Sequence, residues 1–366
     1  MVDVIHHLFH PNQPRKPEAA VVDYSKPHFS VLPAVGYTLS TGLAAIISAN
    51  VIFQNNKSKQ PNLSTILGNI SYTSHKQTIL QVQSNIWTRD NKFKLVGDWR
   101  LMKYPAITYG LGGHSDIDSG YTVDYTYVRF YESVLRAIAK NVYAGIGYSL
   151  DYHWNIEEEL DPSRPTDFQK YGLHDHSVSS GLTFNLLFDN RRNPINATQG
   201  LYANLTYRAN FIELGSDNAY QTLLAEFRKY FSLSSNQRHV LAFWSYNWIT
   251  ISGDPPYLDL PSTGWDGYNN TGRGYIQGRY RGKTFLYLEG EYRFGITRNG
   301  LIGATIFGNA QTVNDWPSDK FTVIAPGAGV GLRIQLNKNS RSNIAIDYGF
   351  GTQGSRGLFV NLGEVF

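Results

Sequence analysis

The sequence predicts an all-β protein, a transmembrane β-barrel of about sixteen antiparallel strands of the outer-membrane type. Three observations support this class. The 366 residues include 25 Tyr, 19 Phe, 7 Trp and 34 Gly, a composition that favours strands and turns. Apolar and polar residues alternate through most of the chain. The long polar connections all follow odd-numbered strands, as the outer loops of such barrels do.

The composition also argues against other classes. No run of eighteen apolar residues occurs, and the longest apolar run, Leu43 to Phe53, contains Ser48 and Asn50, so helical membrane spans are not expected. The net charge is +4, with Lys and Arg scattered among Asp and Glu, so we expect no nucleic-acid partner. The chain has no Cys, which excludes disulfides and thiolate metal sites.

Two-faced strands are the main signal. Apolar residues occupy alternate positions in 43–53, 201–211 and 344–350, a period that places them on one face of a strand. The other faces carry charges of both signs, which would be costly in the dry core of a soluble β-sandwich but suit a wet lumen. This favours the membrane barrel over a soluble β protein. The residues expected to face inward are Asp98, Arg100, Glu226, Arg228, Glu289, Glu291, Arg293, Arg333 and Asp347.

Aromatic residues near the strand ends are expected at the lipid interfaces. Trp244, Tyr246 and Trp248 occupy alternate positions of one strand, and Tyr292 and Phe294 do so in another. Side chains of this kind form girdles at both surfaces of a bilayer. We therefore predict that these five side chains face lipid.

Three segments resemble the outer-membrane assembly-factor superfamily of BamA and TamA type, also called the bacterial surface antigen family. The segment 184–208 resembles the family's Asp-Asn-Arg turn, Asn-Pro and Gly-Leu-Tyr restart. The Gly-Arg-Gly-Tyr motif at 272–275 resembles its Arg-Gly-aromatic motif, and 341–366 resembles its last hairpin. In that hairpin, Phe366 matches the terminal aromatic residue that acts as an assembly signal. The first half of the chain agrees in strand pattern alone.

The resemblance implies that a long loop between the eleventh and twelfth strands folds back into the lumen. Its motif residues are Gly272, Arg273, Gly274 and Tyr275. Glycine allows the backbone to turn tightly, and a guanidinium can bridge carboxylates and carbonyls on the inner wall. The alternative, a solvated loop arginine, stays open.

The expected partners of Arg273 on the barrel wall are Glu291 first and Glu289 second. Family members also use an Asp on the next strand, and Asn309 occupies the matching position here. A neutral acceptor in place of a carboxylate predicts a weaker attachment of the loop.

The predicted organisation is a barrel over residues 28–366 after an N-terminal segment, 1–27. Family members carry periplasmic POTRA domains before the barrel, and 27 residues do not suffice for one. The stretch Val2–His10 has the spacing of a short amphipathic helix that plugs the barrel mouth, and an unstructured tail is the alternative. The start lacks a secretory signal, so we expect a processed chain located in the bacterial outer membrane.

The resemblance implies a role in inserting or translocating proteins or lipids through a gate between the first strand, 28–39, and the last, 357–366. The expected partners are the lipid bilayer, unfolded outer-membrane proteins or lipids, and accessory subunits or a second copy. A passive pore or structural barrel is an alternative function.

A surface hydrolase is the second alternative. His174, Asp175 and His176 form a His-Asp-His triplet, and His114 lies two residues from Asp116. On a strand, alternate residues share a face, so the central Asp points away from both His and the triplet is not a triad. The pair His6 and His10 in the N-terminal segment is the metal-site candidate. We expect no catalytic residue, no cofactor and no metal.

Overall fold

The computed structural model describes residues 26–54, 62–159, 165–172, 175–191, 193, 196–336 and 341–366. The predicted helix or plug at 2–10 and the pair His6 and His10 lie outside these residues. The strands are β1 His28–Thr38, β2 Gly42–Phe53, β3 Ser64–Thr73, β4 Thr78–Trp87, β5 Phe93–Lys103, β6 Ala106–Thr108, β7 Tyr121–Ala139, β8 Val142–Glu158, β9 His176–Asp189, β10 Gly200–Asn210, β11 Tyr220–Ser232, β12 His239–Gly253, β13 Thr284–Gly295, β14 Ile302–Val313, β15 Ala325–Gln335, β16 Asn343–Phe350 and β17 Arg356–Leu362.

Helical elements are short in the described chain. They are α2 Asp167–Tyr171 and the 3-10 turns η1 Arg89–Asn91, η2 Ile117–Ser119, η3 Ile212–Leu214 and η4 Tyr257–Asp259. None of the helices in this part of the chain has the length and apolar character needed to cross a membrane.

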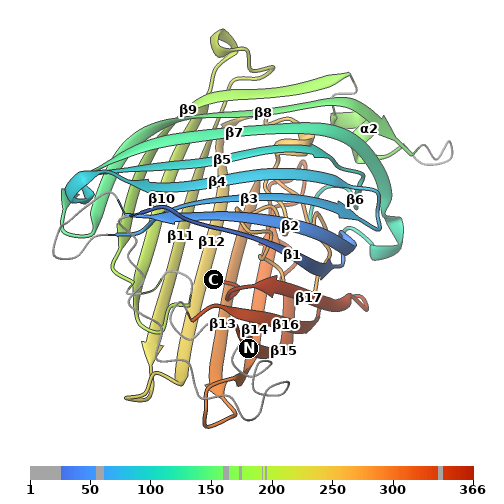
Figure 1. The fold of residues 1–366 in the computed structure, drawn as a ribbon. Helices are drawn as coiled ribbons and strands as arrows, with labels where there is room; N and C mark the ends of the chain where they lie inside the picture. Colours follow the sequence, from blue (N-terminus) through green and yellow to red (C-terminus); the bar gives the residue numbers. More distant parts are fainter. Residues whose placement is uncertain are drawn as a thin grey trace.

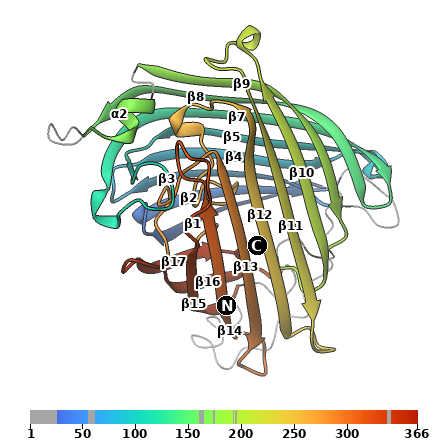
Figure 2. The same cartoon turned by 180° about the vertical axis from the view of Figure 1, so that it is seen from behind.

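The strands form one closed antiparallel sheet. Successive strands pair with each other, and β1 pairs with β17 to close the ring. Both β5 and β6 pair with β7, so the seventeen segments make sixteen positions in the wall. Figures 1 and 2 show this wall from opposite sides. The predicted sixteen-stranded barrel is confirmed.

Alternation along the strands sets the two faces of the wall. In β13, Phe285, Tyr287, Glu289 and Glu291 are buried on the lumen side, whereas Leu288 between them is 58% exposed. Because every second side chain of a strand points the same way, the charged set lies inside and the apolar set faces outward. The strand pattern read from the sequence therefore places the acidic side chains where the long loop can reach them.

The prediction that Trp244, Tyr246 and Trp248 of β12 face lipid is wrong. Trp244 and Tyr246 are buried within the barrel, and Trp248 packs against the same aromatic cluster. The indole N–H of Trp244 donates to Glu226 Oε1 at 2.9 Å, so this side chain faces the lumen. The physical reason is that the long loop fills the lumen. Its apolar side chains pack against large aromatic side chains of the inner wall, whereas the inner wall of a water-filled pore would be polar.

Strand length varies around the wall. β7 has 19 residues and β8 has 17, whereas β1 has 11 and β17 only 7. A transmembrane strand needs about 9–11 residues. The wall is therefore tall at β7 and β8 and low where β1 meets β17.

Candidate functional site

The connection from β12 to β13, residues 254–283, occupies the lumen. Its Tyr257, Tyr275 and Tyr280 are all buried in the aromatic clusters inside the barrel. The carbonyl oxygen of Gly267 accepts a hydrogen bond from Arg100 Nη2 of β5 at 2.7 Å. The connection therefore runs from the β12–β13 side of the wall across to β5. We call residues 254–283 the lumen loop.

Glycine is required at two positions of the motif in the lumen loop. Gly272 and Gly274 have φ of 81° and 105°, backbone conformations that residues other than glycine rarely adopt. A Cβ on Gly274 would lie 2.8 Å from the carbonyl oxygen of Phe350. The backbone at 272–274 therefore lies directly against β16, which brings the Arg273 side chain to the inner wall.

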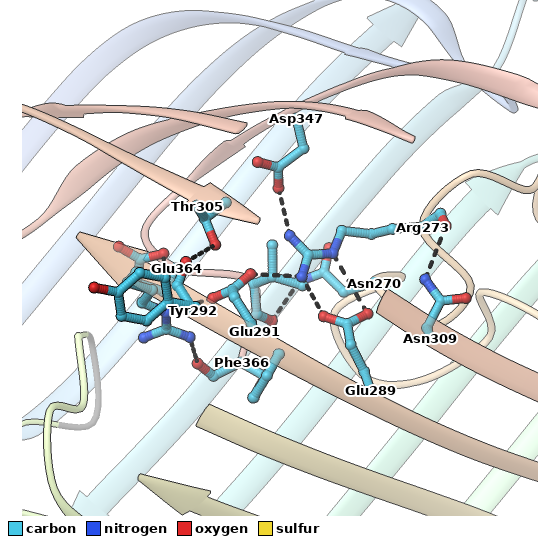
Figure 3. A network of polar contacts seen from close by, with 12 residues as sticks. Asn270, Arg273, Glu289, Glu291, Tyr292, Thr305, Asn309, Asp347, Glu364 and Phe366 are labelled. Carbon is cyan, nitrogen blue, oxygen red and sulfur yellow. Dashed lines mark hydrogen bonds and ion pairs between the residues drawn. The ribbon is translucent and has the colours of Figure 1, made fainter. Parts of the chain in front are cut away.

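Arg273 contacts three carboxylates from two strands. Its Nη2 donates to Glu289 and Glu291 of β13, the latter at 2.5 Å, and its Nη1 donates to Asp347 Oδ2 of β16 at 2.8 Å. Arg273 is 1% exposed, and its guanidinium carbon lies 3.7 Å from the centroid of the Phe307 ring. Figure 3 shows the guanidinium between the three acidic side chains. The structure thus brings together the residues that the sequence singled out.

The carboxylates around Arg273 control its protonation. Burial alone would lower the pKa of Arg273, but Glu289, Glu291 and Asp347 raise it well above its ordinary value. The side chain therefore remains a cation.

The network extends to the last residues of the chain. Arg333 donates to Asp347 Oδ1 at 2.5 Å and to Glu364 Oε2 at 2.7 Å, and Arg293 donates to Glu291. Three guanidinium groups and four carboxylates, those of Arg273, Arg293, Arg333, Glu289, Glu291, Asp347 and Glu364, form this buried network. It joins the lumen loop, the β13–β16 wall and the C-terminal segment.

Asn309 contacts the motif in a different way from the expected one. Its Nδ2 donates to the backbone carbonyl oxygen of Arg273 at 3.0 Å, so it acts as a donor to the loop backbone. Its Oδ1 is buried and has no hydrogen-bond partner among the described residues. The resemblance implied a third carboxylate at the position of Asn309 on β14, and here Asp347 of β16 supplies it instead.

Phe366 lies in the lumen. Gly363 has φ of 95°, and after it the chain leaves β17 and turns inward. The Phe366 ring stacks on Trp244 at 5.2 Å between centroids, and its carbonyl oxygen accepts from Arg293 Nη2 at 2.9 Å. A role for Phe366 as an assembly signal stays a prediction.

Sequence reasoning missed two members of the network. Asp347 was predicted to face inward but not to contact Arg273, because the long-range register between β16 and the loop cannot be read from alternation. Glu364 was not singled out at all. Its nearest signal was Gly363, which marks the turn that carries Glu364 into the lumen.

The residues considered for hydrolysis do not form a triad among the described residues. His176 Nε2 lies 3.9 Å from Asp217 Oδ1 on the exposed rim, and His114 Nε2 shares a hydrogen bond with Thr322, not with Asp116. His174 lies outside the described residues. No group of three His, Cys, Asp or Glu that could hold a metal occurs in the part of the chain that the structure describes.

The seam between β1 and β17 is the second notable feature. In the described chain these strands share one register pair, Tyr37 with Val360. Extending that register would bring Val35 opposite Leu362, and residues 34 to 31 of β1 opposite 363 to 366. Because the chain turns inward at Gly363, no strand of the described residues pairs with that edge of β1 beyond Tyr37.

Comparisons with known proteins agree with this architecture. The model of the Omp85 superfamily domain matches residues 64–366. BamA from Haemophilus ducreyi lacking POTRA domains 1–3 is similar in structure, with a TM-score of 0.61 and 17% identity over 92% of this chain and 70% of that one. CdiB from Acinetobacter baumannii has a TM-score of 0.57 and 13% identity over 93% of this chain. CdiB from Escherichia coli has a TM-score of 0.59 and 10% identity over 94% of this chain.

The chain spans 60% and 63% of the length of the two CdiB chains. No curated protein matches it in sequence. At these identities the structural likeness establishes the fold, and the family follows from the domain model, which matches β3 through β17. The chain therefore belongs to the Omp85 superfamily, whose barrel fold points to the bacterial outer membrane.

Proposed function

We propose that this barrel assists the insertion or translocation of proteins or lipids by opening laterally between β1 and β17. The observation that supports the proposal is the seam itself, where one register pair joins the strands. On its other edge β1 pairs with β2 along its whole length, from His28 with Ile52 to Thr38 with Gly42. The edge of β1 that faces β17 has one register pair among the described residues, so it could pair with a strand of another chain.

The energetic difference between the two edges is large. A backbone hydrogen bond contributes about 0.5–1.5 kcal/mol net, and an unmade one costs several kcal/mol inside a membrane. Opening the seam breaks one register pair, whereas separating β1 from β2 breaks a ladder of eleven residues. Opening at β1–β17 is therefore the least costly way to breach the wall.

The low wall at the seam supports the same proposal. β17 has 7 residues, fewer than the roughly 9–11 that span a bilayer. Lipid next to a short hydrophobic surface must thin or disorder to cover it. A strand of a client protein would then enter the bilayer where the energy barrier to insertion is lowest.

The filled lumen disfavours a passive pore. The lumen loop crosses the barrel and its Arg273 is buried in ion pairs on the inner wall. In the proposed role the loop keeps the barrel closed to solutes while the seam opens. Planar-bilayer recording separates the two functions: the wild type should conduct little, and deletion of 267–281 should open a channel. High wild-type conductance would favour the pore.

A seam crosslink tests the lateral opening. The chain contains no Cys, so Cys at Tyr37 and Val360 would form the sole disulfide. The matched control places Cys at Val35 and Ala45, which are register partners in β1 and β2. The assay is the rate at which an unfolded eight-stranded outer-membrane barrel inserts into liposomes that contain the protein.

We expect the oxidised seam variant to lose its acceleration of insertion and to regain it on reduction, while the control keeps it in both states. An oxidised seam variant with full activity would rule out the gate. If the wild type itself gives no acceleration, insertion of this class of client is not its function.

A further inference from the structure

A cavity of about 210 Å³ lies between the wall and the lumen loop. Its lining includes Ser40 and His75 from the tight turns after β1 and β3, Thr108 of β6, and Trp265 and Arg281 of the loop. The volume far exceeds the roughly 10–15 Å³ that one water molecule needs and is below the roughly 300–1,000 Å³ of pockets for drug-sized molecules. The cavity therefore suits a small chemical group.

The charge of the cavity wall is unbalanced. Among the described residues, Arg281 is the sole permanently charged side chain of the lining, and none of them contributes an Asp or Glu to it. Arg281 is 4% exposed, and no carboxylate oxygen of a described residue lies within 4.0 Å of its guanidinium nitrogens. Its Nη1 donates to the carbonyl oxygens of Tyr257 at 2.8 Å and Leu258 at 3.3 Å. These carbonyls supply partial charge only, and no described residue accepts from its Nη2.

The centroid of the Tyr257 ring lies 5.0 Å from the guanidinium carbon of Arg281 and the ring stabilises the cation in part, but the neighbouring polar groups add no negative charge. Burial raises the pKa of Tyr104, so its phenol stays protonated, and its hydroxyl donates to Gln277 Oε1 at 2.5 Å. Thr108 Oγ1 shares a hydrogen bond with the Tyr257 hydroxyl at 2.7 Å. A buried cation without a counter-charge is costly, and the cost falls when an anion binds beside it.

We propose that this cavity binds a small anionic group, a phosphate or a carboxylate, on Arg281. The guanidinium supplies the charge and two parallel donors, and Thr108 and Thr122 supply hydroxyl groups at the wall. The same chemistry is carried by free anions and by the head groups of anionic lipids. The site is distinct from the Arg273 network and does not depend on the seam.

The test measures binding by thermal unfolding of the full chain in a non-ionic detergent. The probes are inorganic phosphate, acetate, and micelles containing phosphatidylglycerol, with sodium chloride at equal ionic strength and phosphatidylcholine as references. A ligand that binds only the folded state raises the unfolding temperature in a saturable way. The variants are Arg281→Gln, Ala106→Phe, which fills the cavity and leaves Arg281 in place, and the control Arg279→Gln.

Arg279 is a matched control because it is a buried arginine of the same loop, bonded to Ser115 and Gln353 and absent from the cavity lining. We expect saturable binding of at least one probe to the wild type and to Arg279→Gln, weakened at least tenfold in Arg281→Gln and Ala106→Phe. Binding of phosphate or acetate identifies a free anion, and binding of the lipid alone identifies a head group.

Absence of saturable binding to the wild type with all three probes would overturn the proposal. Unchanged affinity in Arg281→Gln or in Ala106→Phe would do the same. If Arg281→Gln does not fold, the cavity-filling variant decides, since it removes the space and keeps the charge.

Discussion

The β1–β17 seam and the β13–β16 wall are both parts of one closed sheet, yet they are held in different ways. The seam has one register pair, and Phe29 and Val35 of β1 are 76% and 67% exposed. At the wall, β13 pairs along its length with both neighbours and its Glu289 and Glu291 hold Arg273 in a buried network. The barrel is therefore strong where the lumen loop docks and weak where the ring closes.

The network also predicts which strand moves if the proposed gate opens. Glu364, two residues beyond β17, pairs with Arg333 of β15, so the last strand is tied to the strong wall. β1, in contrast, pairs with β2 along its whole length. We expect β1 to move away with β2 while β17 stays in place.

The largest expected effect is the loss of Arg273. Arg273→Ala leaves three buried carboxylates without their shared cation, which should destabilise the barrel by about 3–5 kcal/mol. The measurement is the free energy of unfolding from urea titration in liposomes, with proteolysis of the lumen loop as a second readout. The control is Arg89→Ala. The Arg89 side chain is 87% exposed beside Asp90, so its loss should change the free energy of unfolding by less than about 1 kcal/mol. Equally small effects of the two variants on the free energy of unfolding would contradict the claim that the buried network stabilises the wall.

Glu364→Gln should loosen the last strand. Losing the buried, charge-assisted hydrogen bond from Arg333 to Glu364 should cost about 1.5–3 kcal/mol of stability. This cost falls on the segment beside the seam. We expect faster hydrogen exchange in β17 than in the wild type. Unchanged exchange would mean that Glu364 does not hold the strand.

Lowering the pH should reduce the stability of the wild type in the same way as Glu364→Gln does. Burial alone would raise the pKa of Glu364, yet Arg333 and Arg293 hold it below its ordinary value. A carboxyl group with a depressed pKa stabilises the fold above its unfolded pKa of about 4.3, and that contribution is lost as pH falls through the folded value. The wild type should therefore lose its advantage over Glu364→Gln below about pH 4, as followed by unfolding temperature.

Asn309→Asp tests the attachment of the loop backbone. The new carboxylate would lose the donor to the Arg273 carbonyl oxygen and place a charge beside it, at a cost of about 1–3 kcal/mol. Asn309→Ala serves as the control because it loses the donor without adding charge. A gain in stability from Asp would show that the guanidinium turns to meet it, as the family pattern suggests.

The smallest effect concerns Asp259 of η4 in the lumen loop. Its Oδ2 accepts from Ser179 at 2.5 Å, and burial raises its pKa to about 7. The folded state therefore favours the protonated form, and stability decreases as pH rises from about 4 towards 7. Asp259→Asn should raise the unfolding temperature more at pH 8 than at pH 5. An equal shift at both pH values would contradict the buried-acid interpretation.

Much of the fold could be predicted because alternation is a local property. The inward charges of β13 and the outward apolar residues of β2 follow from a period of two, and turn residues mark most strand ends. The lumen-facing position of Trp244 could not be predicted, since its side depends on what fills the barrel. The same holds for Asp347 and Glu364, whose contacts with Arg273 and Arg333 depend on how a distant loop and the turn at Gly363 meet in space.

Distances across the seam test the central claim most directly. Nitroxide labels at Val35 and Leu362, both exposed on the two sides of the seam, and at Leu288 and Ile306 on β13 and β14, can be compared by pulsed electron spin resonance in lipid nanodiscs. We predict a close and a wide population at the seam, with the wide one increasing when an unfolded client barrel is added, and a single narrow distribution at the wall. A single narrow distribution at both places, unchanged by the client, would contradict lateral opening.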